Sequence, residues 1–194
     1  MNNNDVLRRI RYIFDLNDKK MMSLSSSVNQ KVTREQVSNW LKKDDDPAQV
    51  TMNDGQLAIF LNAFIDEKRD KKEGAARPPE KKLTNNLIFM KLKIALNLQA
   101  EDVLQILSRA NFKLSKHELS AFFRKPGHKH YRECKDQILR NFLQGMQHKY
   151  RTSPSVSKAG AKPDNTKSES TQTKSTKPEN AKPSSPYKWK KIDK

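Results

Sequence analysis

The sequence contains little of what disulfide-bonded, membrane-spanning or secreted proteins require. Cys134 is the only cysteine in 194 residues, so the chain can form neither an internal disulfide nor a zinc finger built on cysteines. No apolar run approaches the ~20 residues that cross a bilayer, and the N-terminal residues lack the apolar core of a secretory signal. We therefore expect a cytoplasmic protein without a transmembrane segment.

Sequence signs of catalysis are also scarce. The five glycines are scattered and form no phosphate-binding loop. The chain contains no Gly-x-Ser-x-Gly sequence, and its four histidines all lie between residues 117 and 148. These features predict a protein that is not an enzyme and that needs no cofactor.

The two-residue alternation of β-strands is missing, and apolar residues instead recur at intervals of three and four, as in amphipathic helices. The chain also repeats itself without a gap at an offset of 82 residues: Asn3-Asn4 recurs as Asn85-Asn86, and Phe60-Leu61 recurs as Phe142-Leu143. The sequence therefore predicts an all-α fold of two tandem four-helix modules. Because each module alone has a thin core, we expect the two to pack against each other.

The repeat sets the expected domain boundaries. The modules are predicted at residues 1–65 and 83–150, joined by a charged linker at 66–82 and followed by a tail at 151–194. The tail is rich in Lys, Ser, Thr and Pro and has too few apolar residues to offset the entropy of ordering, so we expect it to be disordered. The net charge of +17 is uneven, because the first module carries +1 whereas the second module and the tail carry +7 each. Such a cationic field attracts polyanions, including nucleic acid.

Two short segments give the most specific local predictions. Thr33 with Gln36, and Ser115 with Glu118, have the spacing of a capping box, which predicts helix starts at 33 and 115. Helices are also expected at about 18–28, 53–66 and 132–149.

The segment 32–41 and its copy 114–123 are similar to the second helix of a helix-turn-helix, whose N-terminal residues can contact base edges. Arg and Asn can pair with guanine and adenine, whereas Lys mainly meets phosphate. The usual turn glycine is absent, and Val37 and Trp40 are equally typical of simple helix packing, which is the alternative interpretation. The candidate nucleic-acid-binding residues in the modules are Arg34, Asn39, Lys42, Lys43, Lys116, His117, Arg124 and Lys125.

Near the end of the tail, Tyr187 and Trp189 alternate with lysines. This pattern suits stacking on bases beside phosphate contacts, and it equally suits a short peptide that docks on a protein. Both aromatic residues are therefore candidate nucleic-acid-binding residues.

Two clusters could suggest a metal ion, but neither has the required spacing. The acidic run 44–46 lacks the distal Glu of an EF-hand, and three carboxylates before Pro47 are typical of a solvated helix end. His128, His130 and Cys134 match no zinc pattern. We interpret them as a basic turn followed by a buried cysteine, and we predict no metal site.

With the duplicated Asn-Asn start, the stretch 37–47 (Val-Ser-Asn-Trp-Leu-Lys-Lys-Asp-Asp-Asp-Pro) and the closing stretch 60–65 (Phe-Leu-Asn-Ala-Phe-Ile), the chain resembles the YehS-like family. These are small bacterial proteins built from two copies of a domain of unknown function. The resemblance covers roughly residues 1–150 and implies a bacterial cytoplasmic protein without specifying its task. One departure is Ser25–Ser27, where the family tends to be apolar.

The leading hypothesis is a non-enzymatic protein that binds nucleic acid through a helix-turn-helix-like module and the basic tail. The alternative is a protein-interaction adaptor that holds a partner helix or peptide between the two modules. A third option is attachment of the tail to an anionic membrane.

Overall fold

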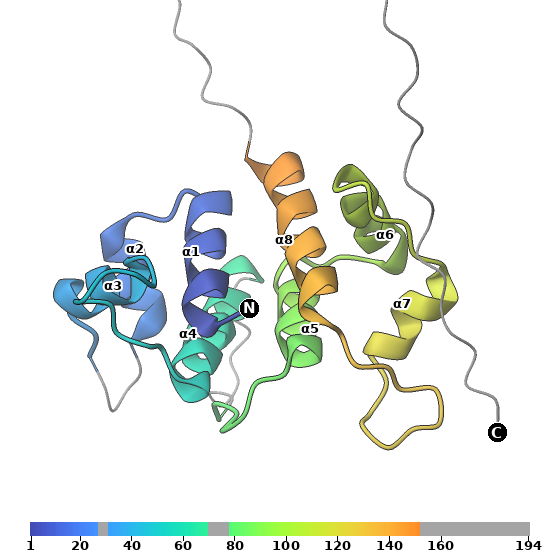
Figure 1. The fold of residues 1–194 in the computed structure, drawn as a ribbon, viewed down its shortest axis with the longest axis horizontal. Helices are drawn as coiled ribbons and strands as arrows, with labels where there is room; N and C mark the ends of the chain where they lie inside the picture. The colour runs from blue at the N-terminus through green and yellow to red at the C-terminus, as the bar shows by residue number, and fades with distance from the viewer. Residues whose placement is uncertain (27–30, 70–77, 152–194) are drawn as a thin grey trace, which may run out of the picture. The chain divides into compact units, whose positions relative to one another are not determined.

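The computed structural model describes residues 1–26, 31–69 and 78–151. Within these ranges the chain forms eight α-helices and no strand, as Figure 1 shows, which confirms the prediction of an all-α fold with two tandem modules. The tail predicted to be disordered lies outside the described residues from Thr152 onward.

Each module consists of four helices in the same order. The first module contains α1 (Asn3–Ile13), α2 (Asp18–Ser25), α3 (Arg34–Leu41) and α4 (Asp54–Lys68). The second contains α5 (Asn85–Ala95), α6 (Ala100–Arg109), α7 (Lys116–Phe122) and α8 (Asp136–Tyr150).

The two capping boxes form as predicted. Thr33 is the N-cap of α3 and exchanges hydrogen bonds with Gln36, and Ser115 does the same for α7 with Glu118. These caps satisfy amides at the first turn that have no partner within the helix. The two helix starts were therefore predictable from local sequence.

Two other helix boundaries differ from prediction. The second helix ends at Ser25, with Ser26 as its C-cap, and residues 27–28 of the predicted helix lie outside the described residues. The last helix was expected from Arg132 and instead begins at Asp136. The reason is tertiary: the preceding residues lie outside the helix, where the side chain of Asn86 binds the Arg132 carbonyl and the Cys134 amide.

The two modules share one hydrophobic core. Residues Met1–Ser155 form one compact unit, and a single cluster of buried side chains takes members from all eight helices. The first helix of each module packs on the last helix of the other, because α1 contacts α8 and α5 contacts α4. These two pairs are equivalent under the 82-residue offset, so the modules are joined reciprocally.

Polar contacts follow the same reciprocity. At the start of α4, Asp54 Oδ2 accepts a hydrogen bond from the amide of Leu83 (2.9 Å). At the equivalent position of α8, Asp136 accepts one from the amino group of Met1, which lies 82 residues before Leu83. The hydrogen bond from the Met1 amino group, and to a lesser extent the one from Asn85, lowers the pKa of Asp136 below its ordinary value. In each module, the aspartate at the start of the last helix therefore binds a backbone nitrogen at the beginning of the other module.

Candidate nucleic-acid interface

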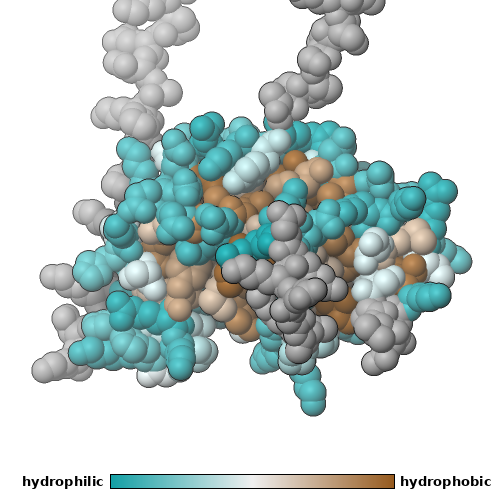
Figure 2. Space-filling model, turned by 180° about the vertical axis from the view of Figure 1, so that it is seen from behind, coloured by the Kyte–Doolittle hydropathy of each residue, from teal (hydrophilic) through white to brown (hydrophobic). Residues whose placement is uncertain are grey.

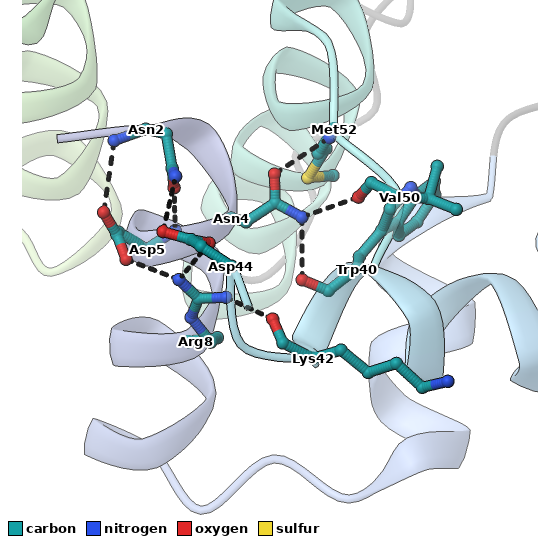
Figure 3. A network of polar contacts seen from close by, with 9 residues as sticks. All are labelled: Asn2, Asn4, Asp5, Arg8, Trp40, Lys42, Asp44, Val50 and Met52. Atoms are coloured by element: carbon teal, nitrogen blue, oxygen red, sulfur yellow. Dashed lines mark hydrogen bonds and ion pairs between the residues drawn. The ribbon is translucent and has the colours of Figure 1, made fainter. Parts of the chain in front are cut away.

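Residues 42–53 of the first module, the acidic loop, connect α3 to α4 and are anchored by one buried amide. Asn4 Nδ2 donates to the carbonyl oxygens of Trp40 and Val50, both at 2.8 Å. Asn4 Oδ1 accepts from the amide of Met52 at 2.9 Å (Figure 3). One side chain of α1 therefore fixes the end of α3 and the far part of this loop.

Residues 124–135 of the second module, the basic loop, have the same anchor 82 residues later. Asn86 Nδ2 donates to the carbonyl oxygens of Phe122 (2.9 Å) and Arg132 (2.8 Å), and its Oδ1 accepts from the amide of Cys134 (2.9 Å). The two loops are equal in length and bound at equivalent atoms. The loops differ in their side chains and at one backbone position, because Gly127 has a φ of 88° whereas its counterpart Asp45 has no positive φ.

The charges of the two loops are opposite. The acidic loop has two lysines and three aspartates, a net of −1, whereas the basic loop has five Lys or Arg and one Glu, a net of +4. Most of the basic side chains are exposed: Lys125, His128, Lys129, His130, Arg132 and Lys135. The single acid, Glu133, pairs with Lys135 at 2.6 Å. The second module thus presents a cationic loop where the first does not.

In the acidic loop the protein supplies partners for its own charges. Arg8 of α1 binds Asp5 at 2.6 Å and Asp44 at 3.1 Å, and it also donates to the Lys42 carbonyl (Figure 3). Burial lowers the pKa of Arg8, but the hydrogen bonds to the two carboxylates outweigh it and the pKa is raised. Lys42 itself lies 3.9 Å from Asp46. This loop is therefore nearly self-neutralised.

The residues predicted on α3 and α7 are partly engaged. Arg34 Nε donates to Asp18 at 3.0 Å, and Lys116 Nζ donates to Glu101 at 2.6 Å. The hydrogen bond from Lys116 lowers the pKa of Glu101. Because the Arg34 and Lys116 side chains remain 78% and 72% exposed, these surface ion pairs are weak and leave both cations accessible.

The other predicted residues divide by exposure. Lys43, His117 and Lys125 are exposed, whereas Asn39, Lys42 and Arg124 are half-buried. The inward faces of both helices pack in the core through Val37, Trp40, Leu119 and Phe122. Contact of these two helices with base edges in the major groove of DNA stays a prediction. Tyr187 and Trp189 lie outside the described residues.

Sequence reasoning did not select His128, Lys129, His130 and Arg132 as site residues. The signal that could have found them is the 82-residue offset applied to charge, since their counterparts are Asp46, Pro47, Ala48 and Val50. Cys134 is 1% exposed, and burial above all raises its pKa to about 12, so it is a core residue. Within the described ranges, no three His, Cys, Asp or Glu side chains gather to hold a metal ion.

Two clefts open near the junction of the modules. One, of about 410 Å³, is lined by Ile13, Phe14, Asp15 and Lys68 of the first module and by Leu96, Tyr150 and Arg151 of the second. The other, of about 550 Å³, contains Arg8 and Arg11, which already bind carboxylates. Figure 2 shows apolar side chains reaching the surface across the middle of one face. None of the described helices has the length and apolarity needed to span a membrane.

The eight helices of the described residues, in two reciprocally packed copies, define an all-α tandem-repeat protein. A family described as "Protein of unknown function (DUF1456)" matches the chain twice, at residues 3–70 and 85–152, and the chain belongs to this family. It is 42% identical over 147 residues to "Uncharacterized protein YehS" of Escherichia coli, covering 75% of this chain and 94% of that protein. The resemblance seen in the sequence is thus confirmed. No solved structure matches the chain.

Proposed function

We propose that this protein is a non-enzymatic nucleic-acid-binding protein whose second module contacts the phosphate backbone through the basic loop and α7. The proposal rests on the opposite net charges of two loops that are held by equivalent asparagine side chains. Asn4 and Asn86 make equivalent hydrogen bonds, yet one loop has a net charge of −1 and the other of +4. A side-chain change that leaves the backbone anchor intact indicates a surface adapted to a polyanion.

The distribution of cations fits a phosphate surface. Lys116 of α7 is exposed and adds a further cation to the second module, and His117 beside it in the chain is also exposed. Contacts from Lys and Arg to phosphate position a protein on nucleic acid without reading its sequence. The affinity is therefore expected to fall steeply with salt, with a log–log slope of about −0.9 per phosphate neutralised on duplex DNA.

The first experiment is fluorescence anisotropy with labelled duplex DNA, single-stranded DNA and RNA, each over a series of salt concentrations. The matched variants are Lys125→Ala in the basic loop and Lys43→Ala at the equivalent, also exposed position of the acidic loop. We expect Lys125→Ala to weaken binding and to reduce the salt slope by about 0.9, the contribution of one phosphate. Lys43→Ala is expected to leave both unchanged.

A chain ending at Ser155 separates the folded modules from the tail, because Met1–Ser155 is a compact unit. Binding retained by this chain supports recognition by the second module. Binding that disappears with the tail, or equal effects of the two lysine variants, contradicts the proposed interface. Absence of binding at low salt contradicts the function as a whole.

A second candidate function, a protein-interaction adaptor, is favoured by the 410 Å³ cleft. Its walls come from both modules, and Phe14, Leu96 and Tyr150 give it an apolar interior. Such a surface suits the apolar face of a partner helix or peptide. Lys68 and Arg151 add cations to the cleft, so a partner with acidic flanks fits best.

The adaptor function is tested by affinity capture after nuclease treatment and at high salt, conditions that remove nucleic-acid bridges. We expect Leu96→Asp to abolish capture of a specific partner, because it places a charge in the cleft. Val50→Asp is the matched control, since Val50 is 48% exposed and does not line the cleft. Equal capture by both variants contradicts the adaptor function.

A further inference from the structure

Arg124 and His128 lie four residues apart at the start of the basic loop. Because the chain is duplicated, they can be compared with the residues at the equivalent positions of the acidic loop. Their counterparts are Lys42 and Asp46. In the acidic loop, Lys42 Nζ lies 3.9 Å from the carboxylate of Asp46. The first module therefore supplies an anion for the cation at this position.

In the basic loop an imidazole replaces that carboxylate. Arg124 Nη1 lies 3.4 Å from His128 Nε2. His128 Nδ1 is 3.1 Å from the backbone nitrogen of His130, and an amide N–H can only donate, so Nδ1 is the acceptor. The proton of the neutral imidazole must then be on Nε2. Two N–H donors consequently face each other without an acceptor between them.

A second observation concerns the guanidinium of Arg124. Its Nε is buried and has no hydrogen-bond partner in the part of the chain that the structure describes. The only carboxylate of the loop, Glu133, pairs with Lys135. Because Nε is itself buried, an acceptor from outside the described residues meets this guanidinium at Nη1, which is exposed and faces His128.

We infer that Arg124 and His128 form a phosphate-binding pair, in which one phosphodiester oxygen of bound nucleic acid accepts from Arg124 Nη1 and His128 Nε2. The two nitrogens are 3.4 Å apart, so one oxygen can lie at ~2.9 Å, the usual hydrogen-bond length, from both of them. Arginine suits this role because its planar donors match phosphate oxygens. The inference rests on the proposed nucleic-acid binding and specifies which residues hold the backbone.

The test compares two substitutions with the same change of charge in the full-length chain. His128→Asp restores the carboxylate found at the equivalent position of the acidic loop, so Arg124 gains an internal partner. His130→Asp is the matched control in the same exposed loop. With labelled duplex DNA, we expect His128→Asp to lower affinity at least tenfold more than His130→Asp. It should also reduce the salt slope by about 0.9, the value for one phosphate.

Arg124→Lys provides an independent readout, because it keeps the charge and removes the planar donors. We expect a three- to tenfold loss of affinity, whereas a purely electrostatic role predicts none. Circular dichroism should show all three loop variants folded, since His128 and His130 are exposed and Arg124 is half-buried. A further arm adds inorganic phosphate to the wild-type chain and follows the Arg124 Nε and His128 ring signals by NMR, and we expect both to shift.

The failures are distinguishable. Nucleic-acid binding that His128→Asp and His130→Asp weaken equally, or that Arg124→Lys leaves unchanged, overturns the phosphate pair while the proposed function stands. Wild-type protein that binds no nucleic acid overturns the proposed function and the phosphodiester site together. Phosphate shifts in that case would identify a site for free phosphate instead.

Discussion

Removing the side-chain amide of Asn86 is expected to destabilise the whole folded unit. Asn86→Ala deletes three hydrogen bonds of 2.8–2.9 Å and leaves the Phe122 and Arg132 carbonyls and the Cys134 amide without their partner. Asn86 is only 6% exposed, so bulk water replaces these bonds poorly. A buried group left unsatisfied costs roughly 1–3 kcal/mol.

The three losses do not add in full, because a water molecule can enter the space of the deleted amide. We therefore expect a decrease of about 3 kcal/mol in the free energy of unfolding, at the low end of the sum. This is a large part of the 5–15 kcal/mol that typically separates folded from unfolded domains. Asn4→Ala should cost at least as much, because Asn4 has the same bonds and is fully buried.

The assay is urea denaturation followed by far-UV circular dichroism, with Trp40 fluorescence in a Trp189→Phe background. These are the only two tryptophans, so the remaining signal reports on a buried residue of the first module. Because one core includes both modules, either asparagine variant should shift the Trp40 transition. A loss below about 1 kcal/mol for both, the net contribution of a single ordinary hydrogen bond, would refute the reasoning.

A control and a functional consequence complete this prediction. Asn85 also donates two hydrogen bonds, but its bond to Asp136 is exposed, so Asn85→Ala should cost less than Asn86→Ala. At a temperature where all variants are folded, Asn86→Ala should weaken nucleic-acid binding because it frees the basic loop. Asn4→Ala, which frees the acidic loop, should not.

Four further predictions concern packing and the buried thiol. Gly145→Ala should destabilise the protein by about 2 kcal/mol, a typical cost of overpacking, because a Cβ there would lie 1.9 Å from the Ile106 carbonyl oxygen. Gly55→Ala should instead stabilise it by about 0.5 kcal/mol, since the nearest atom to its Cβ is Asn53 Oδ1 at 3.4 Å; urea titration checks both, and equal signs would contradict the packing. Cys134 should react with a thiol reagent at pH 8 only after unfolding, and rapid labelling of native protein would contradict its burial. As burial raises the Cys134 pKa from 9.0 to about 12, its contribution to stability should be complete below pH 9 and lost as the pH rises toward 12.

Local signals explain why much of the fold was predictable. Capping boxes at Thr33 and Ser115 act within four residues, and the apolar period of each helix is a property of consecutive residues. The duplication was equally visible, because the offset of 82 residues has no gap. These features determined the helix content, the two starts and the tandem arrangement.

The start of α8 shows where local reasoning fails. Residues 132–135 have no feature that forbids a helix, but their backbone groups bind Asn86, which lies 46 and 48 residues earlier in the chain. Hydrogen bonds over such separations form only once the modules fold, so no window of sequence contains them. The reciprocal contacts of Asp54 and Asp136 with the opposite module arise in the same way.

The candidate site, too, has some features that the sequence predicted and others that depend on the tertiary structure. Sequence alone determined the excess of basic residues in the second module and identified Lys116, His117, Arg124 and Lys125 as candidates. Only the tertiary structure revealed that the two loops share an anchor, so their charges can be compared between loops held at equivalent points. It also decided that Arg124 faces an imidazole where the first module has a carboxylate, because side-chain partners depend on the path of the loop and not on composition.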